Sequence, residues 1–181
     1  MKTFHTLILG IALLFVVSCK DEPTESIDTS AQEVTTFYLI RHAEKDRSNP
    51  DNIDPELTQR GLGRAMHWAE ILADASLDAI YTTDYRRTEM TAEPSAVKYG
   101  LSTTYYDPET LNIDAFLAEN YGKNVLVVGH SNTTPDLVNK LIGDDRFASM
   151  DDSDNGSLFI VQRIGEKATV NRLHFSCNCP E

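Results

Sequence analysis

The stretch Val34–Lys45, VTTFYLIRHAEK, decides the fold of this 181-residue chain. Its first seven residues are apolar, aromatic or β-branched, a composition typical of a buried β-strand. Arg41 and His42 follow at once, although a buried strand does not need charged residues at its end. In open α/β sheets, ligands bind beyond the carboxyl ends of the strands. We therefore expect this Arg-His pair to belong to a binding site.

Two further strand-like segments end in the same way. Asp78–Thr83 (DAIYTT) is followed by Arg86 and Arg87. Asn124–Gly129 (NVLVVG) is followed by His130. If the three strands are parallel neighbours, their histidines and arginines gather at one rim, where guanidinium groups fork onto phosphate oxygens. Since a histidine with its ordinary pKa of about 6.5 can offer a lone pair to phosphorus, the rim predicts a phosphate pocket with a nucleophile.

Helical periodicity follows each of the first two strands. Thr58 can cap a helix on whose buried face we expect five apolar residues. These are Leu62, Ala65, Met66, Ala69 and Leu72. A second helical segment spans Arg86–Tyr99 and stops at Gly100. Because proline lacks the N–H that a helix needs, we expect Pro94 to kink this segment or break it in two.

The remaining segments continue the alternation of strands and helices. Ser102–Tyr106 suits a short edge strand, Ile113–Tyr121 a short helix, and another helix runs from about Thr134 to Gly143. The last strands, within Ser157–Phe175, are joined by a turn that contains glycine and predict a hairpin. The pattern predicts an α/β fold, a three-layer α/β/α sandwich with a mainly parallel sheet and an antiparallel element at its end.

Three motifs resemble those of the histidine phosphatase superfamily, also called phosphoglycerate mutase-like. They are LIRHAEK (Leu39–Lys45), YTTDYRRTEMTA (Tyr81–Ala92) and VLVVGHSN (Val125–Asn132). They resemble the family's Arg-His-Gly type motif, its Ser-x-Leu-x-Arg-x-x-x-Thr-Ala type segment and its later Gly-His. The likeness runs from Val34 to Phe175, and Ala43 in place of glycine matches the smaller bacterial branch.

The resemblance implies a role for each matching residue. It makes His42 the nucleophile that is transiently phosphorylated, and Arg41, Arg87 and His130 the groups that hold the phosphoryl group. Aligning the Thr-Ala pair selects Arg87, so that Arg86 points to solvent. Water then hydrolyses the phosphohistidine, and neither a metal nor another cofactor is implied.

The proton donor for the leaving group has no match in the motifs. Ser131 and Asn132 follow His130, and neither is a useful acid. Asp107 and Glu109 lie in a suitable stretch and are the candidates, with a solvated loop carboxylate as the alternative. Without a donor, substrates with good leaving groups, such as phosphoramidates, anhydrides and aryl phosphates, are favoured.

The amino-terminal segment resembles a bacterial lipoprotein signal peptide, residues 1–18. Lys2 precedes the unbroken apolar run Leu7–Val17, which is short for a membrane span. The run ends in VVSC, which resembles a lipobox and implies cleavage before Cys19 and lipid on Cys19. The resemblance predicts a cell-envelope protein, lipid-anchored to the outer membrane and periplasmic or surface-exposed. A plain secretory signal is the alternative.

After the signal peptide we expect three segments. Residues 19–33 form the lipidated cysteine and a polar, acidic tether, 34–176 the phosphatase domain, and 177–181 a tail. In the tail, Cys177 and Cys179 are either unpaired or joined in a strained disulfide. A metal site there would lack ligands.

The net charge and a segment that resembles a calcium loop bear on which ligands the protein can bind. The net charge of −12, without a run of basic residues, argues against nucleic acid. A phosphorylated small molecule or phosphoprotein remains compatible with it, because a cleft can carry a local field of opposite sign. Asp151–Gln162 (DDSDNGSLFIVQ) imitates a calcium loop, but glutamine stands at position twelve and a strand follows, so a polar turn is expected.

Three functions fit these observations. The first is a phosphatase that works through phosphohistidine. The second is a phosphoglycerate-type mutase, which the compact domain argues against, and the third is a lipoprotein that binds phosphate without turning it over.

Overall fold

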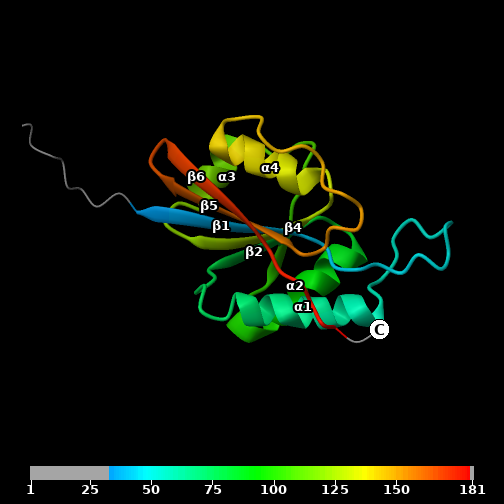
Figure 1. Ribbon diagram of the computed structural model, residues 1–181. Helices are drawn as coiled ribbons and strands as arrows, with labels where there is room; N and C mark the ends of the chain where they lie inside the picture. The colour runs from blue at the N-terminus through cyan, green and yellow to red at the C-terminus, as the bar shows by residue number, and fades with distance from the viewer. Residues whose placement is uncertain (1–32, 180–181) are drawn as a thin grey trace, which may run out of the picture. The chain divides into compact units, whose positions relative to one another are not determined.

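Six β-strands form a single sheet in the computed structural model, which describes residues 33–179 (Figure 1). In chain order, the elements of this part are β1 (Val34–Arg41), α1 (Gln59–Ile71), β2 (Ala79–Thr82), α2 (Arg86–Tyr99), β3 (Thr103–Tyr105), α3 (Ile113–Glu119), β4 (Asn124–Gly129), α4 (Thr133–Ile142), β5 (Ser157–Ile164) and β6 (Lys167–His174).

The sheet is mainly parallel, with an antiparallel hairpin at one edge. Its strand order is β3-β2-β4-β1-β5-β6. The four strands from β3 to β1 pair in parallel, whereas β5 pairs antiparallel with both β1 and β6. The three strands with charged endings, β2, β4 and β1, are consecutive neighbours. In the register of β1 and β4, Arg41 lies opposite Gly129, so that both strands end at the same rim.

Helices cover both faces of the sheet and complete the predicted three-layer sandwich. Figure 1 shows α1 and α2 on one face and α3 and α4 on the other. Under α1 and α2, the core includes Trp68, Ile80 and Leu126. Under α3 and α4, it includes Phe37 and Val127. After Asn124, β4 is apolar to its end because its side chains are buried on both faces.

The predicted buried face of α1 is partly wrong. Met66 is 61% exposed and Leu62 is also exposed, whereas Arg64 and Trp68 are buried. Trp68 packs edge-on against Phe175, and an ion pair with Glu44 compensates the buried charge of Arg64. The buried face of α1 therefore includes Arg64 and Trp68, whose partners Glu44 and Phe175 lie outside the helix and cannot be read from its apolar spacing.

Of the two outcomes expected at Pro94, a kink or a break, the break does not occur, since α2 is one helix that contains this proline. Gly100 ends it in a left-handed conformation, as expected. Its buried residues are small, among them Ala92 and Ser95, while Val97 is 76% exposed. Close packing of small side chains on α1 and the sheet offsets the hydrogen bond that proline cannot donate.

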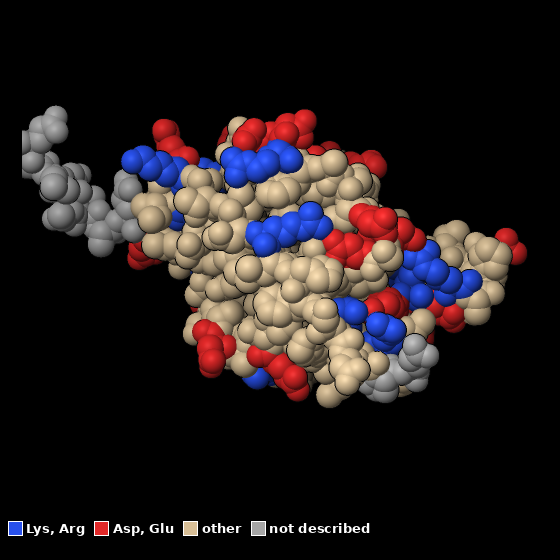
Figure 2. Space-filling model, viewed as in Figure 1, with Lys and Arg blue, Asp and Glu red and all other residues tan. Residues whose placement is uncertain are grey.

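The structure describes only a part of the two ends of the chain. The signal peptide, Cys19 and nearly all of the tether lie outside the described residues. Within 33–179, no helix is long and apolar enough to span a bilayer. Cys177 and Cys179 are joined in a disulfide. On the face shown in Figure 2, basic and acidic side chains are interspersed.

Candidate active site

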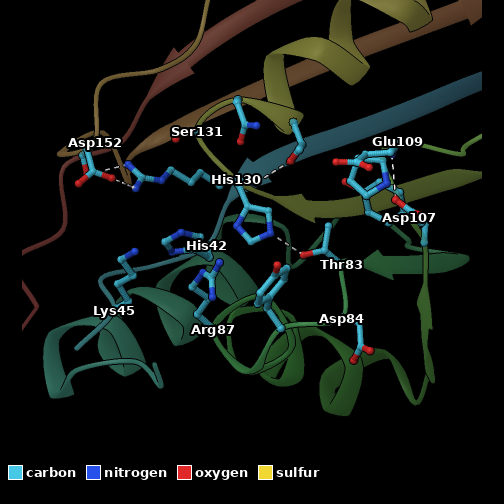
Figure 3. A pocket seen from close by; sticks show the side chains of 16 residues that line it. His42, Lys45, Thr83, Asp84, Arg87, Asp107, Glu109, His130, Ser131 and Asp152 are labelled. Carbon is cyan, nitrogen blue, oxygen red and sulfur yellow. Dashed lines mark hydrogen bonds and ion pairs between the residues drawn. The ribbon is translucent and has the colours of Figure 1, made fainter. Parts of the chain in front are cut away.

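A cavity of about 580 Å³ opens beyond the carboxyl ends of β1, β2 and β4. Its lining includes all four residues expected to act on phosphate, namely Arg41, His42, Arg87 and His130. Figure 3 shows the side chains of His42, Arg87 and His130 converging from different elements. These four residues are called the phosphate pocket below.

His42 lies at the tip of β1 with a defined tautomer. Its ring is 3% exposed, and Nδ1 lies 2.7 Å from the carbonyl oxygen of Ala43. Because a carbonyl only accepts hydrogen bonds, Nδ1 carries the proton and Nε2 keeps its lone pair. The pKa of His42 is lowered to about 3, mainly by burial and in addition by Arg41, His130 and Arg87, while the hydrogen bond to Ala43 acts in the opposite direction. The ring is therefore neutral at neutral pH.

Backbone contacts fix the residue that carries this ring. The amide of His42 donates to the oxygen of Gly129 (2.9 Å), which continues the pairing of β1 with β4. The carbonyl of His42 accepts from Nδ2 of Asn155 (2.8 Å), and the next amide, that of Ala43, donates to Oγ1 of Thr91 (2.9 Å). Ala43 is buried and does not have a positive φ, so the position has no need of glycine.

His130 follows β4 and faces His42. The ring centroids are 5.4 Å apart, close enough for both rings to contact one phosphoryl group. Nε2 of His130 lies 2.8 Å from Oγ1 of Thr83, and Tyr85 packs edge-on against the ring. Burial and then Arg87 and Arg41 lower the pKa of His130 to about 4. In the free protein, therefore, the permanent positive charge of the pocket comes from its arginines.

Arg41 is 2% exposed, and its guanidinium group bonds to a distant segment of the chain. Nη1 donates to the carbonyls of Asp151 (3.0 Å) and Asp152 (2.7 Å), and Nη2 donates to the Asp152 carboxylate. Nε is buried without a hydrogen-bond partner. An unpaired N–H in a cavity wall is costly unless a ligand accepts from it.

Arg87, rather than Arg86, enters the pocket. Its guanidinium carbon lies 4.1 Å from the ring centroid of Tyr85, and Nη1 lies 3.4 Å from Oδ1 of Asp54. Like Arg41, it has a buried Nε without a partner. Arg86 is exposed and pairs with Glu56. The choice made by aligning the Thr-Ala pair therefore agrees with the geometry.

The amino end of α4 closes one side of the pocket. Ser131, Asn132 and Thr133 line the cavity there, and the first N–H groups of a helix favour an anion. Gly129 permits this close approach, because a Cβ at that position would lie 2.8 Å from Oγ1 of Thr134.

Both candidate proton donors line the same cavity. In Figure 3, Asp107 and Glu109 lie across it from Lys45 and Arg87. Both carboxylate oxygens of Asp107 accept bonds within its own loop, from the amide of Glu109 (2.9 Å) and Oγ1 of Thr110 (3.0 Å). Glu109 has the freer carboxylate of the two.

The sequence did not indicate three residues of the site. Asp152 contacts Arg41, Asn155 contacts His42, and Asp54 contacts Arg87. For Lys45 the sequence left open a place at the mouth of the pocket or a solvated side chain, and in the structure Lys45 lines the cavity. Asp152 and Asn155 lie in the calcium-like segment, where their spacing indicated only a polar turn. Within residues 33–179, no three His, Cys, Asp or Glu side chains are grouped so as to hold a metal ion.

Comparison with known protein families finds one match, over part of the domain. Residues 37–109 match the family model described as histidine phosphatase superfamily (branch 1). The match runs from within β1 to the loop after β3, and thus includes Arg41, His42 and Arg87. This part of the chain is similar to that superfamily, in agreement with two of the three motifs. No curated protein sequence matches the chain at a significant level.

Solved structures with the same fold include several phosphatases. A mycobacterial glucosyl-3-phosphoglycerate phosphatase in complex with inorganic phosphate is 16% identical, with a TM-score of 0.63 over 78% of this chain and 98% of its own. The α-ribazole phosphatase of Shigella flexneri is 19% identical, with a TM-score of 0.60 over 77% and 96%. SixA of Agrobacterium tumefaciens, proposed to be a phosphohistidine phosphatase, is 20% identical, with a TM-score of 0.56 over 77% and 97%. At these identities, the likeness establishes the fold alone.

Proposed function

We propose that this protein is a phosphatase that hydrolyses phosphomonoesters or phosphoramidates through a phosphohistidine on His42. The observation that carries the proposal is the state of that residue. Its ring is neutral, its Nδ1 is held by a carbonyl, and its free Nε2 lies in a cavity walled by two arginines with unpaired N–H groups. A neutral imidazole among fixed cations is what in-line attack on a phosphate requires.

In the first step, Nε2 of His42 forms a bond to phosphorus as the bond from phosphorus to the leaving group breaks. Arg41 and Arg87 balance the charge on the equatorial oxygens, and the amino end of α4 adds further N–H donors. Such positioning and charge stabilisation supply most of the catalysis in phosphoryl transfer, so the arginines can do this without a metal.

Glu109 is the proposed proton donor to the leaving group. Its carboxyl group lines the cavity across from the cations, whereas Asp107 is engaged within its own loop. In the second step, water attacks phosphorus, the bond from phosphorus to Nε2 breaks, and inorganic phosphate leaves. Glu109, as the carboxylate, can accept the proton of that water.

The test is turnover of an aryl phosphate by the purified protein without added metal. The wild type should release phosphate, and His42→Ala should lose activity by roughly 10³-fold or more, because the covalent intermediate cannot form. Acid-labile labelling of His42 during turnover should accompany the activity. Turnover at the wild-type rate by His42→Ala would refute the mechanism.

The same assay with a second substrate tests the donor. Glu109→Gln should slow hydrolysis of an alkyl phosphate, whose leaving group needs a proton, by roughly 10²-fold or more. It should slow that of an aryl phosphate far less. Asp107→Asn is the matched control. If it slows hydrolysis of the alkyl phosphate more than Glu109→Gln does, Asp107 and not Glu109 is the proton donor.

The alternatives predict other products. A mutase would return phosphate to another position of phosphoglycerate instead of releasing it. A protein that only binds phosphate would show no turnover, although phosphate would still bind. The structural neighbours named as phosphatases support hydrolysis, and a panel of phosphorylated compounds would define the substrate.

We also propose that lipid on Cys19 anchors the phosphatase to the outer membrane, periplasmic or surface-exposed. The support is the lipobox-like VVSC after an apolar run, followed by a polar tether.

A further inference from the structure

The segment Met150–Gly156, between α4 and β5, reaches over the edge of the phosphate pocket. It provides three acceptors to Arg41, namely the carbonyls of Asp151 and Asp152 and the Asp152 carboxylate. The second carboxylate oxygen of Asp152 lies 2.6 Å from Nη2 of Arg47. Figure 3 shows Asp152, with its dashed contacts, at the margin of the cavity.

The segment is held to the same part of the protein that carries the nucleophile. The amide of Met150 donates to the carbonyl of Ser131 (2.7 Å), next to His130. Nδ2 of Asn155 donates to the carbonyl of His42 (2.8 Å). These two hydrogen bonds fix the segment that carries Asp152 relative to both His42 and His130.

The donors of Arg41 divide into two sets. A guanidinium group has five N–H bonds, of which the segment uses three, all on Nη1 and Nη2. Two remain, including that of Nε, which is buried without a partner in the described structure. Two adjacent N–H groups can donate to two phosphate oxygens at once. Holding the guanidinium group by its other donors fixes its orientation before substrate arrives.

We propose that Asp152 is a positioning residue that holds Arg41 so that its remaining N–H groups face a phosphoryl group at His42. The inference rests on the proposed function, since it concerns the same pocket. It assigns a role to the calcium-like segment, whose acidic residues contact cations of the protein instead of a metal ion. Asp152 acts through Arg41 and does not itself touch the reacting atoms.

A competing role makes the opposite prediction. If the Asp152 carboxylate stood where phosphate binds, its removal would free Arg41 and tighten phosphate binding. Two features oppose this. Arg47 already balances the charge of Asp152, and the bonds to Asp152 leave Nε of Arg41 available. Removal should therefore loosen Arg41 and weaken phosphate binding.

The test is binding of inorganic phosphate to the full chain by calorimetry, which does not depend on turnover. Asp152→Ala should raise the Kd about tenfold, since Nη2 of Arg41 loses its acceptor and the remaining N–H groups of the guanidinium lose their fixed orientation. Asp152→Asn keeps an acceptor oxygen and should stay within about threefold of wild type. The matched control is Asp144→Ala, which removes an exposed carboxylate that pairs with Arg146 in its own loop.

A double-mutant cycle shows whether Asp152 acts through Arg41. In an Arg41→Lys background, which lacks the fork, Asp152→Ala should change the Kd less than about twofold. If the fold-changes in Kd caused by Arg41→Lys and Asp152→Ala multiply in the double variant, the proposal is overturned. It is also overturned by tighter or unchanged binding in Asp152→Ala, or by no phosphate binding by the wild type.

The effect of the Asp152 substitutions on phosphate binding can be separated from misfolding and from loss of turnover. The side chain of Asp152 is 64% exposed, so its removal should leave the fold intact, and Asp152→Ser should reproduce the loss if the alanine variant misfolds. If the wild type binds phosphate but turns over no phosphate ester, the proposed function fails while the comparison at Asp152 still decides this inference.

Discussion

Charge at single residues decides what the pocket can do. The sequence predicted a histidine that could be neutral near its ordinary pKa. Packing goes further, because burial and neighbouring arginines lower the pKa of His42 to about 3 and that of His130 to about 4. His42, the proposed nucleophile, is therefore unprotonated at neutral pH.

The shift at His42 also makes stability depend on pH. With a pKa of about 3 in the folded protein and 6.5 as the ordinary value, the unfolded chain binds more protons between these values. Stability is therefore complete above pH 6.5 and falls as the pH is lowered toward 3. Between pH 6.5 and 5, His42 should account for at most about 2 kcal/mol.

Urea unfolding at pH 7 and pH 5 measures this effect. The free energy of unfolding of the wild type should fall more between the two values than that of His42→Gln, which has no titrating ring. Equal decreases in the two proteins would mean that other groups, such as carboxylates, cause the whole change.

Close backbone approach matters at the scale of elements. Gly61, in the first turn of α1, packs on the segment that follows His42, and a Cβ there would lie 2.2 Å from the carbonyl oxygen of Glu44. Oγ1 of Thr58 caps the same turn by accepting from the amide of Gly61, and also donates to that carbonyl. One end of α1 therefore supports the backbone of the active site.

Gly61→Ala should destabilise the domain by about 2 kcal/mol or more, although alanine is the better helix former, because backbone must move to admit the methyl group. Met66→Ala, on the exposed face of the same helix, should change stability by less than about 0.5 kcal/mol. Thermal or urea unfolding compares the two. A neutral or stabilising Gly61→Ala would contradict the contact.

At the scale of the whole molecule, basic side chains gather on one side of the cavity. The net charge is −12, and acidic side chains are spread over the face in Figure 2, yet Arg41, Lys45 and Arg87 all line this cavity, with Asp107 and Glu109 across from Lys45 and Arg87. A local field of this kind can attract a phosphorylated substrate to an acidic protein.

The compact unit from Ala31 to Glu181 predicts that catalysis and anchoring are separable. A chain that begins at Ala31 should fold cooperatively and keep kcat/KM for an aryl phosphate within about twofold, because the phosphate pocket lies within it.

In cells, Cys19→Ala should move the full protein from the membrane to the soluble fraction. Membrane retention of this variant would refute the lipid anchor.

The sequence by itself predicted the layered, mainly parallel fold and the four residues that line the cavity at the strand ends. It could do so because buried strands are apolar runs, and because Arg41, His42, Arg87 and His130 stand directly at strand ends or one turn beyond. These are local patterns that survive without knowledge of packing.

Only the tertiary structure decided how the pocket is held and charged. Asp152 and Asn155 are more than 110 positions from Arg41 and His42, and their own neighbours look like a polar turn. The rotation of α1 toward Phe175 and the continuity of α2 through Pro94 likewise depend on partners from other elements. Contacts between segments far apart in the chain leave no periodicity in either segment, and burial, which sets the pKa of His42, exists only after folding.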